Sequence, residues 1–273
     1  MPEGPEIRRA ADRVARVLVG RPIVAADLRM PGIKRFEGRL TGSSVTAIET
    51  RGKAMLTRFD NGLTLYSHNQ LYGRWYITRR PKLPKTGREL RVALHTPTHS
   101  ALLYSASDIE VLTQRGLANH PFLNRVGPDI LDPDLTVEQV AERLGSRKFR
   151  NRALGHLYLD QAFLAGIGNY LRSEILWAAR VNPAAKPAQL NLASIREVAR
   201  QTLTISRRSY RTRGVTAPPK AAKERKASGM SYQQYRFQVF GREGLACYEC
   251  GTTIERPRMG SRNLFVCVVC QLF

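Results

Sequence analysis

Residues 160–181 read DQAFLAGIGNYLRSEILWAARV and contain two apolar segments around a short glycine-containing turn, GIG at 166–168. The spacing of the apolar side chains predicts a helix over DQAFLAG (160–166) and a second helix over NYLRSEILWAARV (169–181). Two helices joined by so short a turn form an element like the helix-turn-helix of DNA-binding proteins. This stretch therefore predicts a helical, DNA-binding centre for the chain.

More helices are expected on both sides of this centre. In LDPDLTVEQVAERLG (131–145), Thr136 is a candidate helix cap, and the residues that follow it share one apolar helical face, namely Val137, Val140, Ala141 and Leu144. LNLASIREVARQTLTI (190–205) predicts a further helix. The polar stretch between residues 207 and 235 is rich in Pro, Lys and small residues, which favours a mobile loop.

The N-terminal part of the chain has a different pattern of apolar residues, with one helical repeat followed by alternating segments. Ile7, Ala11, Val14 and Leu18 repeat at helical spacing, and Gly20 is expected to end that helix. Short alternating segments then predict strands, and they are VTAIET (45–50), KAMLTRF (53–59), LTLYSH (63–68), RWYIT (74–78), LRVAL (90–94) and ALLYS (101–105). Asp60-Asn61-Gly62 between two of them is a hairpin signal, so the region predicts an antiparallel β-sandwich or barrel.

The charge balance points to a polyanionic partner. The chain has 44 Lys and Arg against 22 Asp and Glu, a formal net charge of +22. Ribosomal, histone-like and membrane-surface proteins share such a surplus, so the charge alone says nothing about catalysis. The sequence shows no apolar run near the roughly 18 residues of a membrane span and no signal-peptide pattern, which predicts a cytoplasmic protein that does not enter membranes.

The cysteines predict a metal site. Cys247, Cys250, Cys267 and Cys270 form C-x2-C-x16-C-x2-C, a spacing at which two knuckles bring four thiolates around one zinc ion. Four protein ligands leave no open position for water, so the zinc is expected to be structural. Disulfides or free thiols remain the alternative, although a reducing compartment disfavours disulfides.

The residues between the two knuckles predict a hairpin. RPRMGSRNLF (256–265) has Gly260-Ser261 at its tip and Arg262 just beyond it, and short strands are expected nearby at RFQVF (236–240), TTIERPRM (252–259) and NLFVC (263–267). A planar guanidinium on a rigid hairpin suits phosphate recognition. A solvated turn residue is the alternative for Arg262.

The N-terminus carries a candidate nucleophile. The small side chain of Pro2 permits removal of Met1, and the ordinary pKa of an α-amino group, about 7.7–8.0, leaves part of it neutral at physiological pH. A nearby helix start lowers this pKa further, and the neutral amine can attack a sugar C1′ to form a Schiff base. Glu3 could protonate the sugar ring oxygen, although a helix start also stabilises its ionised form, so this role requires desolvation in the DNA complex. The alternative is that MPEGPE only starts a helix.

Four motifs resemble one family of DNA-repair enzymes. They are MPEGPE (1–6), TRGKA (50–54), LAGIGNYL (164–171) and the terminal cysteine motif, and together they resemble the formamidopyrimidine-DNA glycosylase and endonuclease VIII family from end to end. LYSHNQLYG (65–73), LLYSASDIE (102–110) and HPFL-RVGPD (120–129) resemble its bacterial endonuclease VIII branch.

The resemblance implies an α+β multidomain fold. Its expected parts are an N-terminal catalytic β-sandwich with the first helix (1–125), a helix-two-turn-helix DNA-binding domain (126–214), a basic flexible loop (215–235) and a zinc-finger hairpin (236–273). The loop, which carries Lys220, Lys223, Arg225 and Lys226, looks extended relative to the bacterial pattern. Added phosphate affinity and a merely solvated linker both remain open for it.

The resemblance also implies catalytic roles. Pro2 would be the Schiff-base nucleophile, Glu3 the proton donor supported by Glu6, Lys53 a donor that assists β-elimination, and Arg262 a donor that assists δ-elimination. Taken without the family, Lys53 would be a solvated lysine after a glycine-containing turn.

The implied DNA contacts come from other parts of the chain. Gln70, Leu71 and Tyr72 resemble a wedge that fills the gap left by an extruded nucleotide, although Leu71 and Tyr72 could instead form a strand-end pair in the core. Asn169 at a helix start and Arg125 before Val-Gly-Pro are the other expected contacts. A helix-capping role for Asn169 and a turn-fixing role for Arg125 are the alternatives.

The sequence thus predicts a bifunctional DNA glycosylase and abasic-site lyase of base excision repair that acts on oxidised pyrimidines by β,δ-elimination. The expected partner is double-stranded DNA with oxidised bases or abasic sites, and the enzyme is expected to be a monomer with one zinc ion. An oxidised-purine glycosylase and a noncatalytic, zinc-containing binder of damaged DNA are the alternatives.

Overall fold

The computed structural model describes residues 2–271, and these fall into two compact units. Unit 1 comprises Pro2 and Glu6–Arg125, and unit 2 comprises Glu3–Pro5 together with the chain from Val126 onward. Residues Glu3–Pro5 thus pack with the C-terminal part of the chain although they precede the first strand. In the described part of the chain, no helix is both long and apolar enough to span a bilayer.

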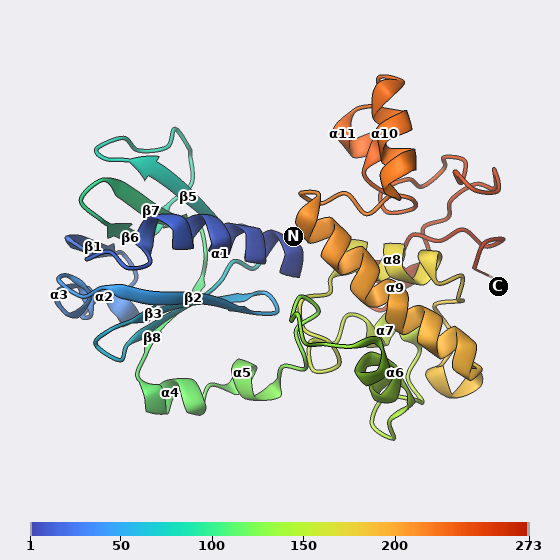
Figure 1. Ribbon diagram of the computed structural model, residues 1–273, viewed down its shortest axis with the longest axis horizontal. Coiled ribbons are helices and arrows are strands. Elements are labelled where there is room, and N and C mark those ends of the chain that lie inside the picture. The colour runs from blue at the N-terminus through green and yellow to red at the C-terminus, as the bar shows by residue number, and fades with distance from the viewer. Residues whose placement is uncertain (1, 272–273) are drawn as a thin grey trace. The chain divides into compact units, whose positions relative to one another are not determined.

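Two four-stranded antiparallel sheets form unit 1 and confirm the predicted β-sandwich (Figure 1). One sheet has the order β2-β3-β4-β8 and the other has the order β1-β6-β7-β5. The strands are β1 (Ala25–Leu28), β2 (Val45–Arg51), β3 (Ala54–Phe59), β4 (Thr64–His68), β5 (Arg74–Arg79), β6 (Leu90–His95), β7 (His99–Tyr104) and β8 (Asp108–Leu112). The six predicted strands are all present, whereas β1 and β8 were not foreseen.

Helix α1 (Gly4–Leu18) contributes its apolar face to the core between the sheets (Figure 1). Ile7, Val14 and Leu18 are at most 2% exposed and pack with Val45 of one sheet and Leu103 of the other. Burial of each such side chain contributes about 1.5–3 kcal/mol. Four short helices complete the unit, namely α2 (Pro31–Lys34), α3 (Glu37–Leu40), α4 (Gln114–Ala118) and α5 (Pro121–Arg125).

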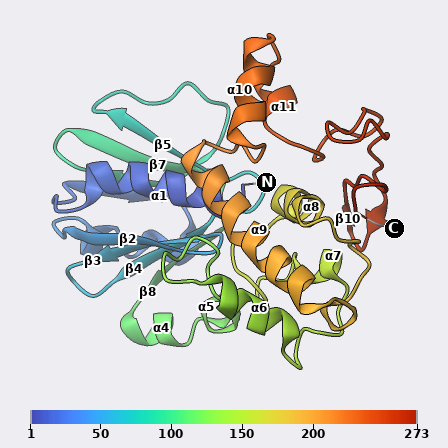
Figure 2. The same cartoon turned by 45° about the vertical axis from the view of Figure 1, so that its right-hand side comes forward.

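Unit 2 is helical around α8 (Asn169–Ala178), which lies beside the long helix α9 (Leu192–Arg211) (Figure 2). The other elements are α6 (Val137–Gly145), α7 (Leu154–Leu157), η1 (Pro187–Gln189), α10 (Pro219–Ala227), α11 (Tyr232–Tyr235), β9 (Arg258–Met259) and β10 (Arg262–Asn263). The predicted helix cap at Thr136 is present and forms a capping box, because Thr136 and Gln139 each accept a hydrogen bond from the other's backbone N–H. Val140 and Leu144 of its apolar face are buried as expected.

The helix predicted over 160–166 is wrong, since this segment forms consecutive turns. Several backbone groups of this segment form hydrogen bonds with side chains in place of the regular backbone hydrogen bonds of a helix. The Asp160 carboxylate accepts from the backbone N–H of Ala162, the Gln161 side chain bonds to Gly166 and Ile167, and Arg143 donates to two carbonyl groups of the segment. The predicted second helix is present and ends earlier, at Ala178.

The prediction of a mobile loop between residues 207 and 235 is also wrong. Helix α9 continues to Arg211, and α10 and α11 occupy much of the remainder. The strand predicted at 236–240 is absent because its N–H groups serve another partner, as Gln238, Val239 and Phe240 all donate to the buried Glu174 carboxylate. The strands predicted at 252–259 and 263–267 shorten to β9 and β10 with isolated bridges beside them.

Candidate active site

The Glu3 carboxylate lies against the N-terminus of α8. Glu3 is 3% exposed and accepts the backbone N–H groups of Gly168 at 2.7 Å, Tyr170 at 2.8 Å and Leu171 at 3.3 Å. Helix N-termini present unpaired N–H groups and a positive partial charge, and both stabilise an ionised carboxylate. The sequence suggested that such a helix end would come from α1, whereas the structure supplies it from α8, 165 residues away.

The glycines of the GIG turn make this approach possible. A Cβ on Gly168 would lie 2.3 Å from the Glu3 Cδ, and a Cβ on Gly4 would lie 3.0 Å from the Gly166 Cα. Gly166 also has a φ of +100°, and its carbonyl oxygen accepts from the Gly4 N–H at 2.8 Å. These glycines therefore let the N-terminal segment lie directly on the backbone of the turn.

A fully buried arginine, Arg172, links three parts of unit 2. Its guanidinium donates to the Gly155 carbonyl at 2.9 Å, the Asn169 Oδ1 at 2.6 Å and the Asn263 carbonyl at 3.0 Å. Burial lowers the pKa of Arg172 to about 10, while the charge of Glu3 acts to raise it. The group stays cationic at neutral pH and forms part of the environment of Glu3.

Arg172 was not among the residues expected from the sequence. Its position in an otherwise apolar helix, three residues after Asn169, indicates a buried charge with hydrogen-bond partners. Asn169 itself is not the helix cap, because Gly168 holds that position and makes no side-chain cap. The Asn169 Nδ2 donates to the Asn263 carbonyl at 2.8 Å. The expected DNA-contact residue thus helps to fasten β10 to α8.

Arg262 lies on the predicted hairpin. Gly260 at the tip has a φ of +67°, and Arg262 begins β10 beyond it with an exposed side chain. The next residue, Asn263, is the one that Asn169 and Arg172 bind. The hairpin also packs on α7, since a Cβ at Gly155 would meet the Met259 Sδ at 2.3 Å.

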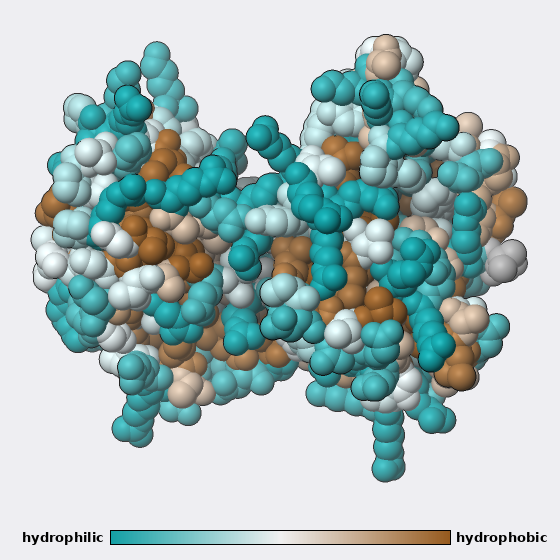
Figure 3. Space-filling model, viewed as in Figure 1, coloured by the Kyte–Doolittle hydropathy of each residue, from teal (hydrophilic) through white to brown (hydrophobic). Residues whose placement is uncertain are grey.

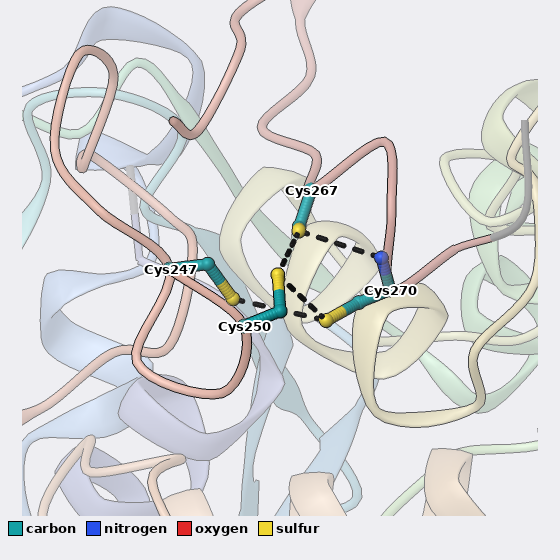
Figure 4. A group of neighbouring side chains, drawn as sticks. All are labelled: Cys247, Cys250, Cys267 and Cys270. Atoms are coloured by element: carbon teal, nitrogen blue, oxygen red, sulfur yellow. Dashed lines mark hydrogen bonds between the residues drawn. The ribbon is translucent and has the colours of Figure 1, made fainter. Parts of the chain in front are cut away.

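The four cysteine sulfurs converge at the C-terminal end of unit 2 (Figure 4). The Sγ atoms of Cys250 and Cys267 are 3.4 Å apart, those of Cys250 and Cys270 3.5 Å apart, and those of Cys247 and Cys270 3.8 Å apart. A disulfide needs about 2.05 Å, so the disulfide alternative does not hold. All four sulfurs lie within 4.8 Å of one another, which is close enough to hold one metal ion.

The surroundings of these thiols shift their pKa values in opposite directions. Hydrogen bonding to Thr252 lowers the pKa of Cys250 to about 6, whereas burial raises the pKa of Cys267 and of Cys270. Four thiolates at this spacing repel one another unless a cation lies between them. The donor set therefore fits a thiolate-bound metal.

Lys53 lies in the turn between β2 and β3, after Gly52 with a φ of +61°, and its side chain is half-buried. It is close enough to His68 for its positive charge to affect that imidazole. Burial lowers the pKa of His68 most, Asp108 acts to raise it, and Lys53 lowers it further. A neutral His68 thus accompanies the cationic Lys53, and this neighbour was not predictable from local sequence patterns.

The segment Asn69–Gly73 forms a fixed turn that exposes two apolar side chains. Leu71 is 55% exposed and Tyr72 is 68% exposed, so the alternative of a strand-end pair in the core is wrong. The Gly73 N–H donates to the Asn69 carbonyl at 2.7 Å, and Gln70 has a φ of +47°.

Two residues outside this segment form hydrogen bonds with the turn. The Ser107 hydroxyl donates to the Gln70 Oε1 at 3.1 Å, and Arg88 donates to the Tyr72 carbonyl at 2.5 Å. Large apolar side chains on a fixed, exposed turn fit insertion into a base stack.

The remaining candidates are in unit 1. Pro2 is bonded directly to Glu3 and becomes an amine when Met1 is removed. Glu6 accepts a hydrogen bond from Arg9 at 3.0 Å, so its support of Glu3 stays a prediction. Arg125 is the exposed last residue of α5.

Two domains known from one protein family together match most of the chain. Residues 1–107 match the formamidopyrimidine-DNA glycosylase N-terminal domain, and residues 126–218 match the formamidopyrimidine-DNA glycosylase H2TH domain. Among curated proteins, Endonuclease 8 of Enterobacter sp. (strain 638) is 52% identical and Endonuclease 8 of Salmonella agona is 51% identical, each over 271 residues. Both matches cover 99% of this chain and 100% of the relative.

Solved structures share the fold. The Lactococcus lactis formamidopyrimidine-DNA glycosylase bound noncovalently to DNA with an abasic site has a TM-score of 0.79 at 21% identity, over 99% of this chain and 100% of that one. The same glycosylase in complex with DNA containing an oxidised pyrimidine has a TM-score of 0.81 at 22% identity, over 100% of both chains. The chain belongs to the formamidopyrimidine-DNA glycosylase and endonuclease VIII family, whose members are DNA glycosylases and abasic-site lyases.

Proposed function

We propose that this chain removes oxidised pyrimidines from DNA through a Schiff base on Pro2 and then cleaves the strand by β,δ-elimination. The Pro2 nitrogen attacks C1′ of the damaged nucleotide, the base departs with a proton, and the sugar ring opens as the iminium forms. Loss of the 3′ phosphate and then of the 5′ phosphate leaves a one-nucleotide gap. The observation that carries this proposal is the buried Glu3 carboxylate, held by three backbone N–H groups beside Pro2.

Glu3 would supply the proton for ring opening. The N–H donors of α8 fix its carboxylate and favour the ionised form, so proton uptake requires the water-free environment of a bound nucleotide. Lys53 is the proposed donor in β-elimination and Arg262 the proposed donor in δ-elimination. The fixed hairpin that carries Arg262 supports its role, since a donor must be held close to the leaving phosphate.

Borohydride trapping tests the nucleophile. Mature protein incubated with an abasic oligonucleotide and borohydride is expected to form a stable covalent adduct that peptide mapping locates at residue 2. Protein that retains Met1 is expected to form no adduct at Pro2, because the Pro2 nitrogen is then an amide. Mass spectrometry establishes the state of the N-terminus in each sample. Mature protein without an adduct, or with an adduct at another residue, contradicts the Schiff-base assignment.

We infer that the turn Asn69–Gly73 is a wedge that fills the space of the extruded nucleotide, with Gln70, Leu71 and Tyr72 entering the stack. Unstacking a base costs a few kcal/mol, and apolar filling of the gap offsets part of this cost. The exposure of Leu71 and Tyr72 supports this role. Asn169 and Arg125 are further proposed DNA contacts.

Gly73→Ala tests the wedge. A Cβ at this position would lie 2.6 Å from both the Cα and the carbonyl oxygen of Asn69, so the turn must move. Base excision from duplex DNA is expected to fall by roughly 10- to 100-fold. Cleavage of a single-stranded abasic site should persist, because no base has to leave a stack. Gly87→Ala is the matched control, since its Cβ meets nothing within 4 Å. Equal excision by both variants would count against the wedge.

We further propose that the four cysteines bind one structural zinc ion. A tetrahedron with Zn–S bonds of about 2.3 Å has sulfurs about 3.8 Å apart, and the separations of 3.4–3.8 Å fit this geometry. The ion would stabilise a segment whose only regular elements are the two-residue strands β9 and β10 among its described residues, and it would take no part in the chemistry.

The substrate class rests on the endonuclease 8 relatives and on the Gln70-Leu71-Tyr72 segment. Excision of thymine glycol and dihydrouracil is expected to exceed excision of 8-oxoguanine, and the reverse order would favour an oxidised-purine glycosylase. We propose that the enzyme acts as a monomer on double-stranded DNA in the cytoplasm, at the nucleoid. The proposed domains are residues 1–125, 126–214 and 236–273, with the basic segment 215–235 between the last two.

A further inference from the structure

Helix α10 carries a stripe of exposed positive charge. Lys220, Lys223 and Lys226 follow one another at a spacing of three, which places them along one side of the helix, and all three are exposed. Ala221, Ala222 and Arg225 are less exposed and lie toward the protein. No ion pair within residues 2–271 involves any of the three lysines. Hydrophilic side chains cover much of the surface over α10 in the space-filling view (Figure 3).

A stack of two arginines on one tyrosine holds α10 against the cysteine knuckle. The guanidinium carbon of Arg225 lies 3.4 Å from the centre of the Tyr248 ring, and that of Arg242 lies at the same distance. Tyr248 follows Cys247 directly in the chain, within the first knuckle. Flat stacking of a guanidinium on an aromatic face combines cation–π attraction with dispersion.

Hydrogen bonds fix each member of the stack. Arg225 donates to the Gln238 side-chain oxygen at 2.8 Å, and Arg242 donates to the Gln238 carbonyl at 2.6 Å and to the Ala246 carbonyl at 2.7 Å. The Tyr248 hydroxyl donates to the Gln234 carbonyl of α11 at 3.1 Å. The two short helices and the knuckle are therefore connected through one aromatic ring.

This arrangement maintains a helix that would not form alone. Nine residues are too few for a stable isolated helix, and three lysines on one side repel one another. The Arg225–Tyr248–Arg242 stack keeps them ordered and exposed. Arg211, the last residue of α9, and Arg213, two residues after it, are both exposed and add positive charge ahead of α10. The Arg213 carbonyl accepts a hydrogen bond from the Tyr232 hydroxyl of α11 at 2.7 Å.

We propose that the lysine stripe of α10 binds the phosphate backbone of duplex DNA, and that the cysteine knuckle holds the stripe in place through the Arg225–Tyr248–Arg242 stack. The inference rests on the proposed function, because it assigns an additional contact surface for the same DNA. Aligned cations that form no ion pair suit a regular row of phosphates, and Glu224 is the single acidic residue of α10. The outer side of α10 presents no large apolar side chain, which a protein or membrane partner would need.

The first experiment compares two triple variants of equal charge. K220A/K223A/K226A and K34A/K82A/K148A each remove three exposed lysines, and only the first removes the stripe. Affinity for a duplex with a tetrahydrofuran abasic analogue is measured against salt concentration. Loss of the stripe is expected to weaken binding on the order of tenfold and to reduce the slope of log K against log salt by about one unit per lysine. Equal affinities and slopes for the two variants overturn the proposal.

The second experiment tests the connection to the knuckle. Tyr248→Ala removes the ring, and Tyr248→Phe keeps it and loses only the hydroxyl. Hydrogen exchange of the amides of residues 220–227 is expected to speed up at least tenfold in Tyr248→Ala and to stay near wild type in Tyr248→Phe. The salt slope of Tyr248→Ala should fall toward that of the stripe variant. Unchanged exchange and slope in Tyr248→Ala overturn the role of the stack.

These outcomes separate the inference from the function on which it rests. Wild-type protein that neither binds the abasic analogue nor forms a borohydride adduct contradicts the proposed function. Wild-type protein that does both, together with a stripe variant that behaves like the charge-matched control, contradicts only the role of α10.

Discussion

Glu3→Gln is expected to lower the rate of base excision by about two to four orders of magnitude while leaving cleavage of preformed abasic sites much less affected. A positioned general acid contributes about that much to rate, and a glutamine has no proton to transfer. Cleavage of an abasic site needs no departing base, so it depends mainly on the Pro2 amine and the elimination residues. The difference between the two activities is the signature of a proton donor.

The hydrogen-bond geometry adds a structural cost to this substitution. Both carboxylate oxygens of Glu3 accept backbone N–H groups, so the amide nitrogen of a glutamine must face a donor. A buried donor without an acceptor costs about 1–3 kcal/mol, which should appear as a lower thermal midpoint.

Single-turnover excision of dihydrouracil, measured beside cleavage of a preformed abasic site, provides the test. Glu49→Gln is the matched control, because Glu49 forms only a half-exposed surface ion pair with Arg58 at 2.9 Å. Retained abasic-site cleavage shows that the variant is folded. Unimpaired base excision in Glu3→Gln would show that Glu3 is not the proton donor.

Patterns that depend on local spacing were predictable from the sequence. Alternation of apolar and polar residues located six of the strands of unit 1, and the cysteine spacing located the cluster, because each pattern has a geometric meaning within a few residues. The apolar face of α1 was predictable for the same reason. Motif resemblance then supplied what local patterns lack, namely the family, and with it the role proposed for Lys53.

Features that depend on distant partners were not predictable. The helix expected at 160–166 was wrong because Arg143 and neighbouring side chains bind its backbone groups. The strand expected at 236–240 was wrong because Glu174, over sixty residues earlier, accepts its N–H groups. A single sequence pattern does not reveal which buried charge will bind which backbone.

The same limitation hid part of the candidate site. Arg172 and Glu174 are charged residues inside an apolar helix, and each is buried because backbone groups from other segments surround it. The α10 segment was mistaken for a loop because its composition is that of a solvated linker. Arg225 of its helix stacks on Tyr248, which lies in the cysteine knuckle.

Loss of one cysteine is expected to have the second large effect. Cys267→Ser removes a buried thiol that is a proposed zinc ligand, so the zinc content per chain should fall from about one to near zero. The hairpin that carries Arg262 lies between the two knuckles, where Asn169 and Arg172 hold Asn263 and α7 packs on Met259. Displacement of a catalytic group by about 1 Å can cost on the order of 10²-fold in rate.

The product pattern distinguishes this effect from general unfolding. If Arg262 is displaced while Pro2 and Lys53 remain intact, δ-elimination should fall more than β-elimination. Strand cleavage should then leave a 3′ unsaturated aldehyde in place of a 3′ phosphate, which a denaturing gel resolves. Val269→Ser is the matched control in the same knuckle, since Val269 is 57% exposed and supplies no ligand. A Cys267→Ser protein that keeps its zinc and gives the wild-type ratio of the two products would show that neither the metal nor the hairpin depends on this thiolate.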